Sequence, residues 1–172
     1  NWVQDNIKKV DKASNGKIGY IYIPDMGPEG LNEFSRYFYP QLDKEGLIID
    51  DRANGGGNVS PMILERLSRE PYRLTMRRGS ARIGTVPDAV QVGPKVCLIN
   101  KYSASDGDLF PWGFRALGLG KLIGTRTWGG IVGISGSLPY MDGTDIRVPF
   151  FTSFDPKTGS WIIENHGVDP DI

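Results

Sequence analysis

The stretch from Ser103 to Asp108 brings together residue types that can perform acyl-transfer chemistry. It follows an apolar run over residues 96–99 and opens a pattern that predicts a helix. Unpaired N–H groups at a helix start carry a positive partial charge, which stabilises negative charge that develops on an oxygen. Ser105 is therefore a candidate nucleophile, and the backbone N–H of Asp106 is a candidate oxyanion donor. The alternative is that Ser105 only caps the helix, a role in which serine is common.

A glycine-rich loop from Asp51 to Asn58 is the second candidate element. Its three successive glycines permit positive φ angles and let the backbone approach a ligand, so that its N–H groups can face an oxyanion. A phosphate cradle is an alternative, but the loop lacks the Lys-Ser/Thr of a P-loop and the spacing of a dinucleotide fingerprint. A plain flexible turn is the other alternative. Two backbone donors and a nucleophile would make an acyl-transfer site.

Alternating strands and helices are predicted to position these two loops. The apolar runs that predict strands are residues 18–23, 47–51, 96–99 and 121–124. The periodic segments that predict helices are residues 31–42, 61–67 with Ser60 as cap, and 106–117. This order indicates β-α-β crossovers and an α/β fold. Both loops then follow the carboxyl ends of buried strands, where ligands collect in α/β sheets.

The segments outside this pattern have weaker signals. Residues 8–17 are polar and are expected to be turn-rich. Residues 72–94 carry four arginines and are expected to form a solvated loop, with a substrate-facing flap as the alternative. An Asp-Gly pair predicts a tight turn at 141–144 within a hairpin over 137–150, and residues 155–160 are expected to form a second hairpin.

Composition narrows the class of protein. A length of 172 residues suits one domain over residues 1–172, and 20 basic residues balance 20 acidic ones, so neither nucleic acid nor a membrane is an expected partner. Cys97 is the single cysteine and is expected to be a small buried residue. The termini show no signal peptide and start and stop abruptly, which suggests a fragment and leaves localisation open.

Five motifs, taken in order, resemble the C-terminal catalytic subdomain of tricorn-type serine proteases, in the C-terminal-processing peptidase group. They are residues 19–26, 51–57, 103–108, 124–130 and 164–171, which span nearly the whole chain. The resemblance implies a β-α-β superhelical core similar to crotonases and Clp peptidases. It also implies that Ser105 is the nucleophile, that Asp106 is one oxyanion donor through its backbone, and that Gly56 or Gly57 is the other.

One departure from the resemblance concerns the general base. Processing peptidases carry a lysine where this chain has Gly130, so a Ser–Lys dyad is not expected. In the tricorn branch the base is a histidine oriented through a second serine and a glutamate, and Glu164 matches that glutamate. The histidine and its serine lie in an earlier subdomain, ahead of a PDZ-like module, so the fragment alone is expected to be inactive. His166, the single histidine, is expected to be structural.

The resemblance therefore implies the nucleophile-bearing subdomain of a serine endopeptidase that cuts peptides through an acyl-enzyme. Peptide substrates and a homo-oligomeric parent are expected, with no cofactor and no metal. A non-enzymatic ligand- or peptide-binding module on the same fold is the alternative. A crotonase-type acyl-CoA enzyme is a third possibility, against which the Ser105–Asp106 junction argues.

Four further side chains receive structural interpretations. Trp112 and Trp128 are expected in the core or at a subunit contact. Asp108 is expected to interact favourably with the positive end of the helix that it begins. Arg126 either anchors a peptide carboxylate or pairs with a surface acid.

Overall fold

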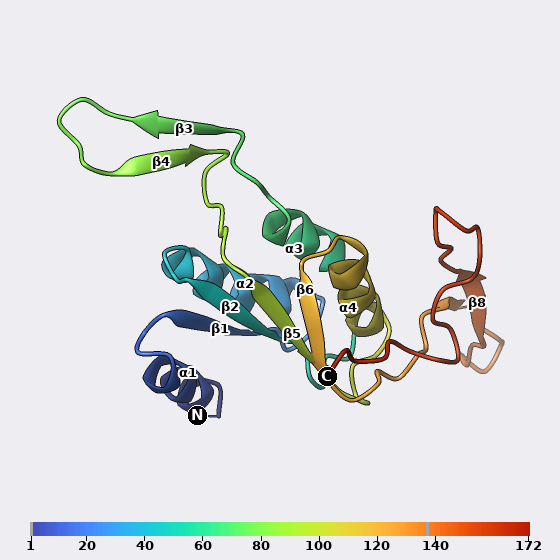
Figure 1. The fold of residues 1–172 in the computed structure, drawn as a ribbon. Helices are drawn as coiled ribbons and strands as arrows, with labels where there is room; N and C mark the ends of the chain where they lie inside the picture. Colours follow the sequence, from blue (N-terminus) through green and yellow to red (C-terminus); the bar gives the residue numbers. More distant parts are fainter. Residues whose placement is uncertain (1, 137) are drawn as a thin grey trace.

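A parallel four-stranded sheet forms the centre of the chain in a computed structural model that describes residues 2–136 and 138–172. The strand order is β1-β2-β5-β6, and every neighbouring pair is parallel (Figure 1). The strands are β1 (Ile18–Tyr22), β2 (Gly46–Asp50), β5 (Lys95–Ile99) and β6 (Gly120–Gly124). Each lies within one residue of its predicted bounds, which confirms the α/β class.

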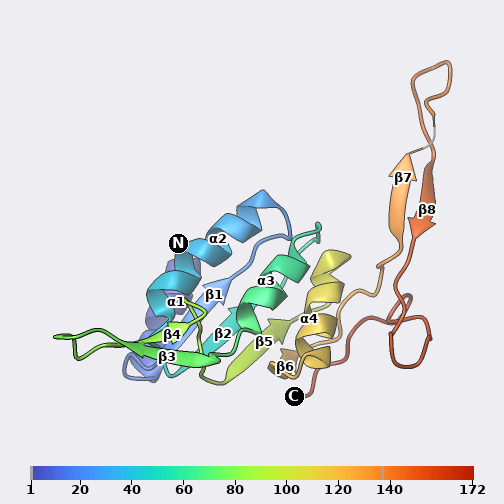
Figure 2. The same cartoon turned by 90° about the horizontal axis from the view of Figure 1, so that it is seen from above.

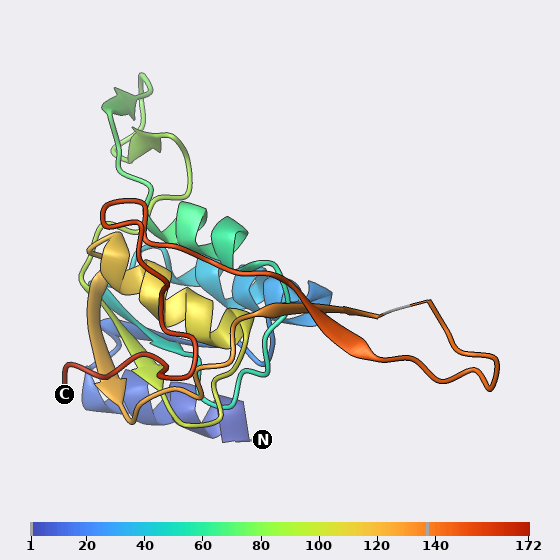
Figure 3. The ribbon, with the colours of Figure 1, turned by 90° about the vertical axis from the view of Figure 1, so that its right-hand side faces the viewer.

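Helices cover both faces of this sheet (Figure 3). One face carries α2 (Pro28–Phe38), α3 (Ser60–Leu67) and α4 (Asp106–Ala116), each of which connects two neighbouring parallel strands. A short 3₁₀ helix, η1 (Tyr39–Gln41), extends α2 and accounts for the predicted helix end near residue 42. The likeness of this arrangement to crotonases and Clp peptidases stays a prediction.

The hydrophobic core lies between the sheet and this helical layer. Phe34 and Phe38 of α2 stack on one another, and Phe110 and Phe114 of α4 are fully buried. They pack in one cluster with sheet residues that include Ile21, Ile49, Cys97 and Leu122. Cys97 is a small buried residue, as predicted. The core therefore holds the start of α4, and with it the candidate serine, against the sheet.

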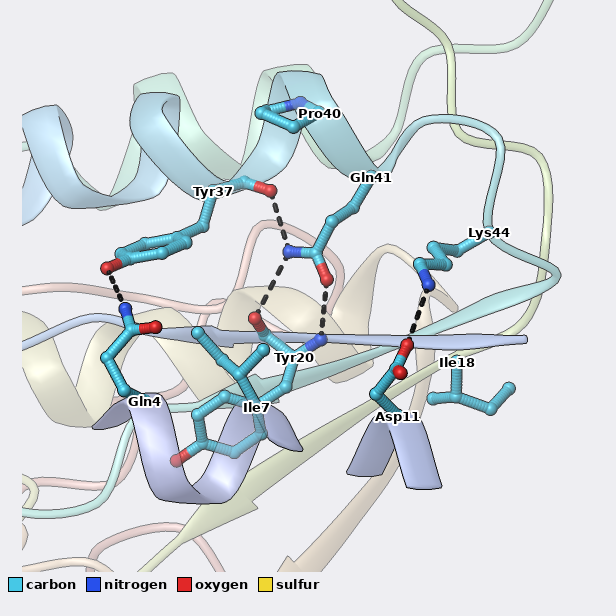
Figure 4. Close-up of a pocket in the computed structure, with 9 residues that line it drawn as sticks. All are labelled: Gln4, Ile7, Asp11, Ile18, Tyr20, Tyr37, Pro40, Gln41 and Lys44. Atoms are coloured by element: carbon cyan, nitrogen blue, oxygen red, sulfur yellow. Dashed lines mark hydrogen bonds and ion pairs between the residues drawn. The ribbon is translucent and has the colours of Figure 1, made fainter. Parts of the chain in front are cut away.

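The opposite face carries α1 (Trp2–Ala13), so the prediction of a turn-rich segment over residues 8–17 is wrong for its first part. No residue of α1 is buried. Half-buried Val3, Ile7 and Val10 face the body of the protein. Polar contacts add to this packing: Gln4 donates to the hydroxyl of Tyr37 at 2.8 Å, and the ammonium of Lys44 lies 3.1 Å from Asp11 (Figure 4). A pocket of about 280 Å³ remains beneath α1, and none of its lining residues belongs to the predicted site.

Two antiparallel hairpins project from the body as arms (Figures 1 and 2). One joins β3 (Arg73–Met76) to β4 (Ile83–Val86), so the prediction of a plain loop over residues 72–94 is wrong. The other joins β7 (Gly133–Gly136) to β8 (Arg147–Phe151) and confirms the hairpin predicted around residues 137–150; Ser137 lies outside the described residues.

The predicted tight turn at 141–144 is present, and in it the Gly143 N–H donates to the Tyr140 carbonyl at 2.9 Å. Where a second hairpin was predicted over residues 155–160, the structure has a turn closed by one isolated bridge between Phe154 and Trp161. Among residues 2–136 and 138–172, no helix combines the length and the apolar composition that crossing a membrane requires.

Candidate active site

The two predicted loops meet at the carboxyl ends of β2 and β5, which run side by side with Asp50 in register with Leu98. The Ala104 N–H donates to the Asn54 carbonyl at 2.9 Å. The Ser103 hydroxyl donates to the Asp51 carbonyl, also at 2.9 Å. Sequentially distant loops are thus joined by hydrogen bonds directly before Ser105.

Ser105 is exposed and has backbone angles of φ +57° and ψ −121°, a region that non-glycine residues rarely adopt. Its hydroxyl makes no hydrogen bond to any described residue, and it does not cap α4. The N–H groups that a cap would take are already satisfied, because Gly107 donates to the Ala104 carbonyl and Asp108 to the Ser105 carbonyl, both at 2.8 Å. Ser105 occupies the N-cap position of α4, but its side chain caps no N–H group, so the prediction of a side-chain cap is wrong.

The glycine loop packs directly against this serine. A Cβ atom on Gly56 would lie 2.6 Å from the Ser105 Cβ and 2.9 Å from the Asp106 nitrogen. The Gly56 N–H donates to the Asn54 side chain at 3.0 Å. By contrast, the N–H groups of Gly57 and Asp106 have no acceptor among the described residues. The geometry therefore favours Gly57 over Gly56 as the second donor.

Asp106 joins the start of α4 to the start of α3. Its carboxylate accepts the Ser60 N–H at 3.0 Å and also the Ser60 hydroxyl proton. Ser60 is the first residue of α3 and does not cap it, so the prediction of Ser60 as cap is wrong. The Asp106 side chain takes the unpaired N–H instead, which suits a carboxylate at a helix N-terminus.

Two further buried carboxyl groups lie close to this site. Asp51 is fully buried, and neither carboxylate oxygen has a hydrogen-bond partner among the described residues. Burial, reinforced by the negative charges of Asp50 and Asp108, raises the pKa of Asp51 well above its usual range. Burial also raises the pKa of Asp108. The site therefore includes a carboxyl group that tends to hold its proton.

Glu164 orders the segment that follows β6. Its Oε2 atom accepts the N–H groups of Ile131 at 2.6 Å and Val132 at 2.9 Å. The same segment reaches α4, because the Gly129 N–H donates to Asp108 at 2.8 Å. No hydrogen bond between described residues joins Glu164 to Ser105 directly. Residues 129–132 connect Glu164 to α4, because Glu164 binds Ile131 and Val132 while Asp108 binds Gly129. Asp108 therefore accepts a tertiary hydrogen bond in addition to its expected interaction with the helix dipole.

The position where processing peptidases carry a lysine is closed here. A Cβ atom on Gly130 would overlap the indole ring of Trp128. The absence of a Ser–Lys dyad stays a prediction, which rests on glycine at this position. Trp128 itself is 66% exposed and lies outside the core, so its expected role at a subunit contact stays a prediction, whereas Trp112 packs against the core as expected.

His166 is engaged at the surface with Asp169. Its Nε2 atom lies 2.8 Å from one carboxylate oxygen, and the Arg126 guanidinium donates to the other at 2.6 Å. Arg126 therefore pairs with a surface acid, and, with a smaller contribution from His166, it lowers the pKa of Asp169. Within the described ranges, no group of three or more His, Cys, Asp or Glu side chains is placed to hold a metal ion.

An apolar groove of about 920 Å³ begins at Asp106 and follows α4. Leu109 and Trp112 form one wall, while Phe154 and Ile162 contribute to the other. An apolar groove with polar backbone groups at one end is the usual form of a ligand site. Asp106 lines the groove, but Ser105 does not.

Sequence reasoning missed Asn54 and Gly129 as parts of this site. Asn54 carried a readable signal, because an asparagine side chain that accepts the N–H two residues later forms an Asx turn. Gly129 carried none, since its contact with Asp108 depends on the tertiary fold.

Comparison with known proteins decides the family. A family model described as peptidase family S41 matches residues 17–172. The chain belongs to this peptidase family. Among its S41 relatives, the tricorn protease of Thermoplasma volcanium is 47% identical over 99% of the chain, and that of Thermoplasma acidophilum is 46% identical over the same share.

A crystal structure of the tricorn protease superposes on this S41 chain with a TM-score of 0.90, at 45% identity over 99% of the chain. The chain spans only 16% of the length of each of the two relatives and 16% of the crystallised chain. The recognition as a tricorn-type member is thus confirmed. The matches do not favour the alternative of a non-enzymatic binding module.

Proposed function

We propose that residues 1–172 form the nucleophile-bearing subdomain of a tricorn-type serine endopeptidase, in which Ser105 attacks the scissile peptide carbonyl. The observation that carries this proposal is the strained, exposed Ser105 with an unused hydroxyl at the start of α4, packed against Gly56. The N–H groups of Gly57 and Asp106 serve as the oxyanion donors. Family membership and the tricorn relatives support the same reaction class.

In the first step, Ser105 Oγ bonds to the carbonyl carbon and its proton passes to a general base. The oxyanion receives hydrogen bonds from the two backbone donors. The tetrahedral adduct then expels the amine, which takes the proton from the base and leaves an acyl-enzyme. Water, deprotonated by the same base, attacks the ester carbonyl and releases the acid and Ser105.

The general base is proposed to be a histidine outside residues 1–172. The single histidine here, His166, is held by Asp169 at the surface. Glu164 has one carboxylate oxygen fixed by two backbone N–H groups, so its second oxygen is available to orient the partners of that histidine. A serine without its base is a weak nucleophile, so residues 1–172 alone should hydrolyse peptides very slowly.

We further propose that the parent protease is a homo-oligomer that acts on peptides, with the groove along α4 receiving part of the substrate. The tricorn relatives and the exposed apolar arms support this proposal. Sizing of the full-length protein measures its oligomeric state.

The test of function is peptide hydrolysis by the full-length protease, by its Ser105→Ala variant and by residues 1–172 alone. Loss of a nucleophile of this kind lowers kcat by about 10⁶-fold. Ser80→Ala, in the exposed β3–β4 hairpin, is the matched control and should retain activity. Full activity of Ser105→Ala would overturn the proposal.

A further inference from the structure

Asn54 is a fully buried side chain at the centre of the contacts around the candidate nucleophile. It immediately precedes the three glycines of the loop. Both ends of its amide are used: Nδ2 donates to the Ile23 carbonyl at 3.2 Å, and Oδ1 accepts the Gly56 N–H at 3.0 Å. The side chain therefore ties the glycine loop to the residue that follows β1.

The backbone of Asn54 makes the link to the nucleophile. Its carbonyl accepts the Ala104 N–H at 2.9 Å, one residue before Ser105. The same carbonyl sits so close to α4 that a Cβ atom on Gly107 would overlap it. One residue thus fixes the glycine loop and the start of α4 relative to each other.

We propose that Asn54 is the positioning residue of the oxyanion hole: it takes the Gly56 N–H for its own side chain and leaves the N–H groups of Gly57 and Asp106 as the donor pair. This inference rests on the proposed function. It adds to that function the assignment that the Gly56 N–H is bound by the Asn54 side chain, whereas the Gly57 N–H is left for the substrate.

The physical reason is that the N–H groups on either side of the Gly57 N–H, those of Gly56 and Asn58, have fixed partners, whereas the Gly57 N–H has no acceptor among the described residues. The Gly56 carbonyl accepts the Met26 N–H at 2.9 Å, and the Asn58 N–H donates to the Met26 carbonyl at 2.7 Å. Asn54 satisfies the Gly56 N–H between these bonds. The Gly57 N–H shares a peptide plane with the Gly56 carbonyl, which Met26 holds, while Asn54 holds the preceding Gly55–Gly56 peptide. Without Asn54 that preceding peptide is free to turn, so the direction of the Gly57 N–H is fixed from one side only. An oxyanion donor acts only when it is already in place as charge develops.

The test compares four forms of the full-length protease: wild type, Asn54→Leu, Asn54→Asp and Gln91→Leu. Leucine keeps the branched shape of Asn54, with a larger volume, and removes both hydrogen bonds. Aspartate keeps an acceptor for the Gly56 N–H. Gln91 is the matched control, because it is another buried amide, and its side chain donates to the Lys44 carbonyl at 2.9 Å away from the site.

We expect Asn54→Leu to lower kcat by about 10²-fold to 10³-fold, the effect of losing one oxyanion donor, with KM changed by less than about threefold. The inhibition constant of a peptide aldehyde, whose adduct carries the oxyanion, should rise in parallel with that loss. The affinity for the corresponding peptide alcohol, which forms no adduct, should stay constant. Asn54→Asp should recover part of kcat, and Gln91→Leu should keep it.

A general loss of stability would affect aldehyde and alcohol alike, and would affect Gln91→Leu as well. The inference is overturned if Asn54→Leu keeps kcat within the range of Gln91→Leu, or if the aldehyde and the alcohol lose affinity equally. Activity that survives Ser105→Ala would instead overturn the proposed function, so the two failures are distinguishable.

Discussion

Gly56 lies against Ser105 so closely that a Cβ atom on the glycine would stand 2.6 Å from the Ser105 Cβ. Real Cβ atoms do not approach one another to this distance, so the contact requires a glycine. Its φ of +98° requires one as well. The close approach of the loop to Ser105 therefore depends on glycine at position 56.

Gly56→Ala is predicted to reduce peptidase activity of the full-length protease by at least about 10²-fold, because the methyl group displaces either Ser105 or the Asp106 donor. Steady-state kinetics on a peptide substrate measures the effect. Gly55→Ala is the control, since a Cβ atom there meets nothing within 4 Å. Equal activity of the two variants would contradict the packing described here.

The strain at Ser105 predicts a difference between two inactive variants. Ser105→Gly relieves the φ of +57°, whereas Ser105→Ala retains it. The glycine variant should be the more stable one by about 1 kcal/mol, even though glycine also gains entropy in the unfolded chain. Urea unfolding of both variants measures this difference. A more stable alanine variant would show that the backbone is not strained.

Gly107→Ala is predicted to destabilise the protein, against the ordinary preference of helices for alanine. In an open helix the change gains about 1 kcal/mol. Here the added Cβ atom would overlap the Asn54 carbonyl, so we expect a loss of about 1–3 kcal/mol, as for overpacking in a core. Urea midpoints measure the sign. Ala116→Gly, at the exposed end of α4, reports the ordinary preference; a stabilised Gly107→Ala variant would contradict the contact.

Asp51 predicts a pH dependence of stability. Because its pKa is raised in the folded state, folding retains a proton that the unfolded chain releases above about pH 4. Stability should therefore fall as pH rises from that value through the raised pKa, by up to about 1.4 kcal/mol per pH unit for one group.

Asp51→Asn keeps the size of the protonated side chain and removes its titration, so the stability of this variant should decline less steeply with pH. Urea midpoints between pH 5 and pH 8 compare it with the wild type. Parallel profiles for the two proteins would show that Asp51 is not protonated in the folded state.

The parts of the fold that follow apolar pattern were predictable from sequence. The four sheet strands and α4 are buried runs or periodic segments that end at glycine, proline or a polar loop, so pattern and tertiary structure agree. The α1 helix was missed although Val3, Ile7 and Val10 recur at helical spacing and are half-buried, because the polar residues between them resemble a turn-rich segment. The β3–β4 arm was missed because every residue of β3 is exposed, which removes the alternation that identifies a strand.

The site was predictable only to the level of its loops. Residue type and position after a strand indicate Ser105 and the glycine loop, and the family resemblance indicates Glu164. The choice between Gly56 and Gly57 depends on the direction of the Asn54 side chain, which no spacing rule gives. The closure of position 130 likewise depends on where the Trp128 ring lies.

The most direct test of the central claim is labelling of the full-length protease with a fluorophosphonate, followed by mass mapping of the modified peptide. We predict one adduct, on Ser105, that is absent in Ser105→Ala and absent when residues 1–172 are treated alone. An adduct on another residue, or an unlabelled Ser105 in a folded and active protease, would contradict the assignment of Ser105 as the nucleophile.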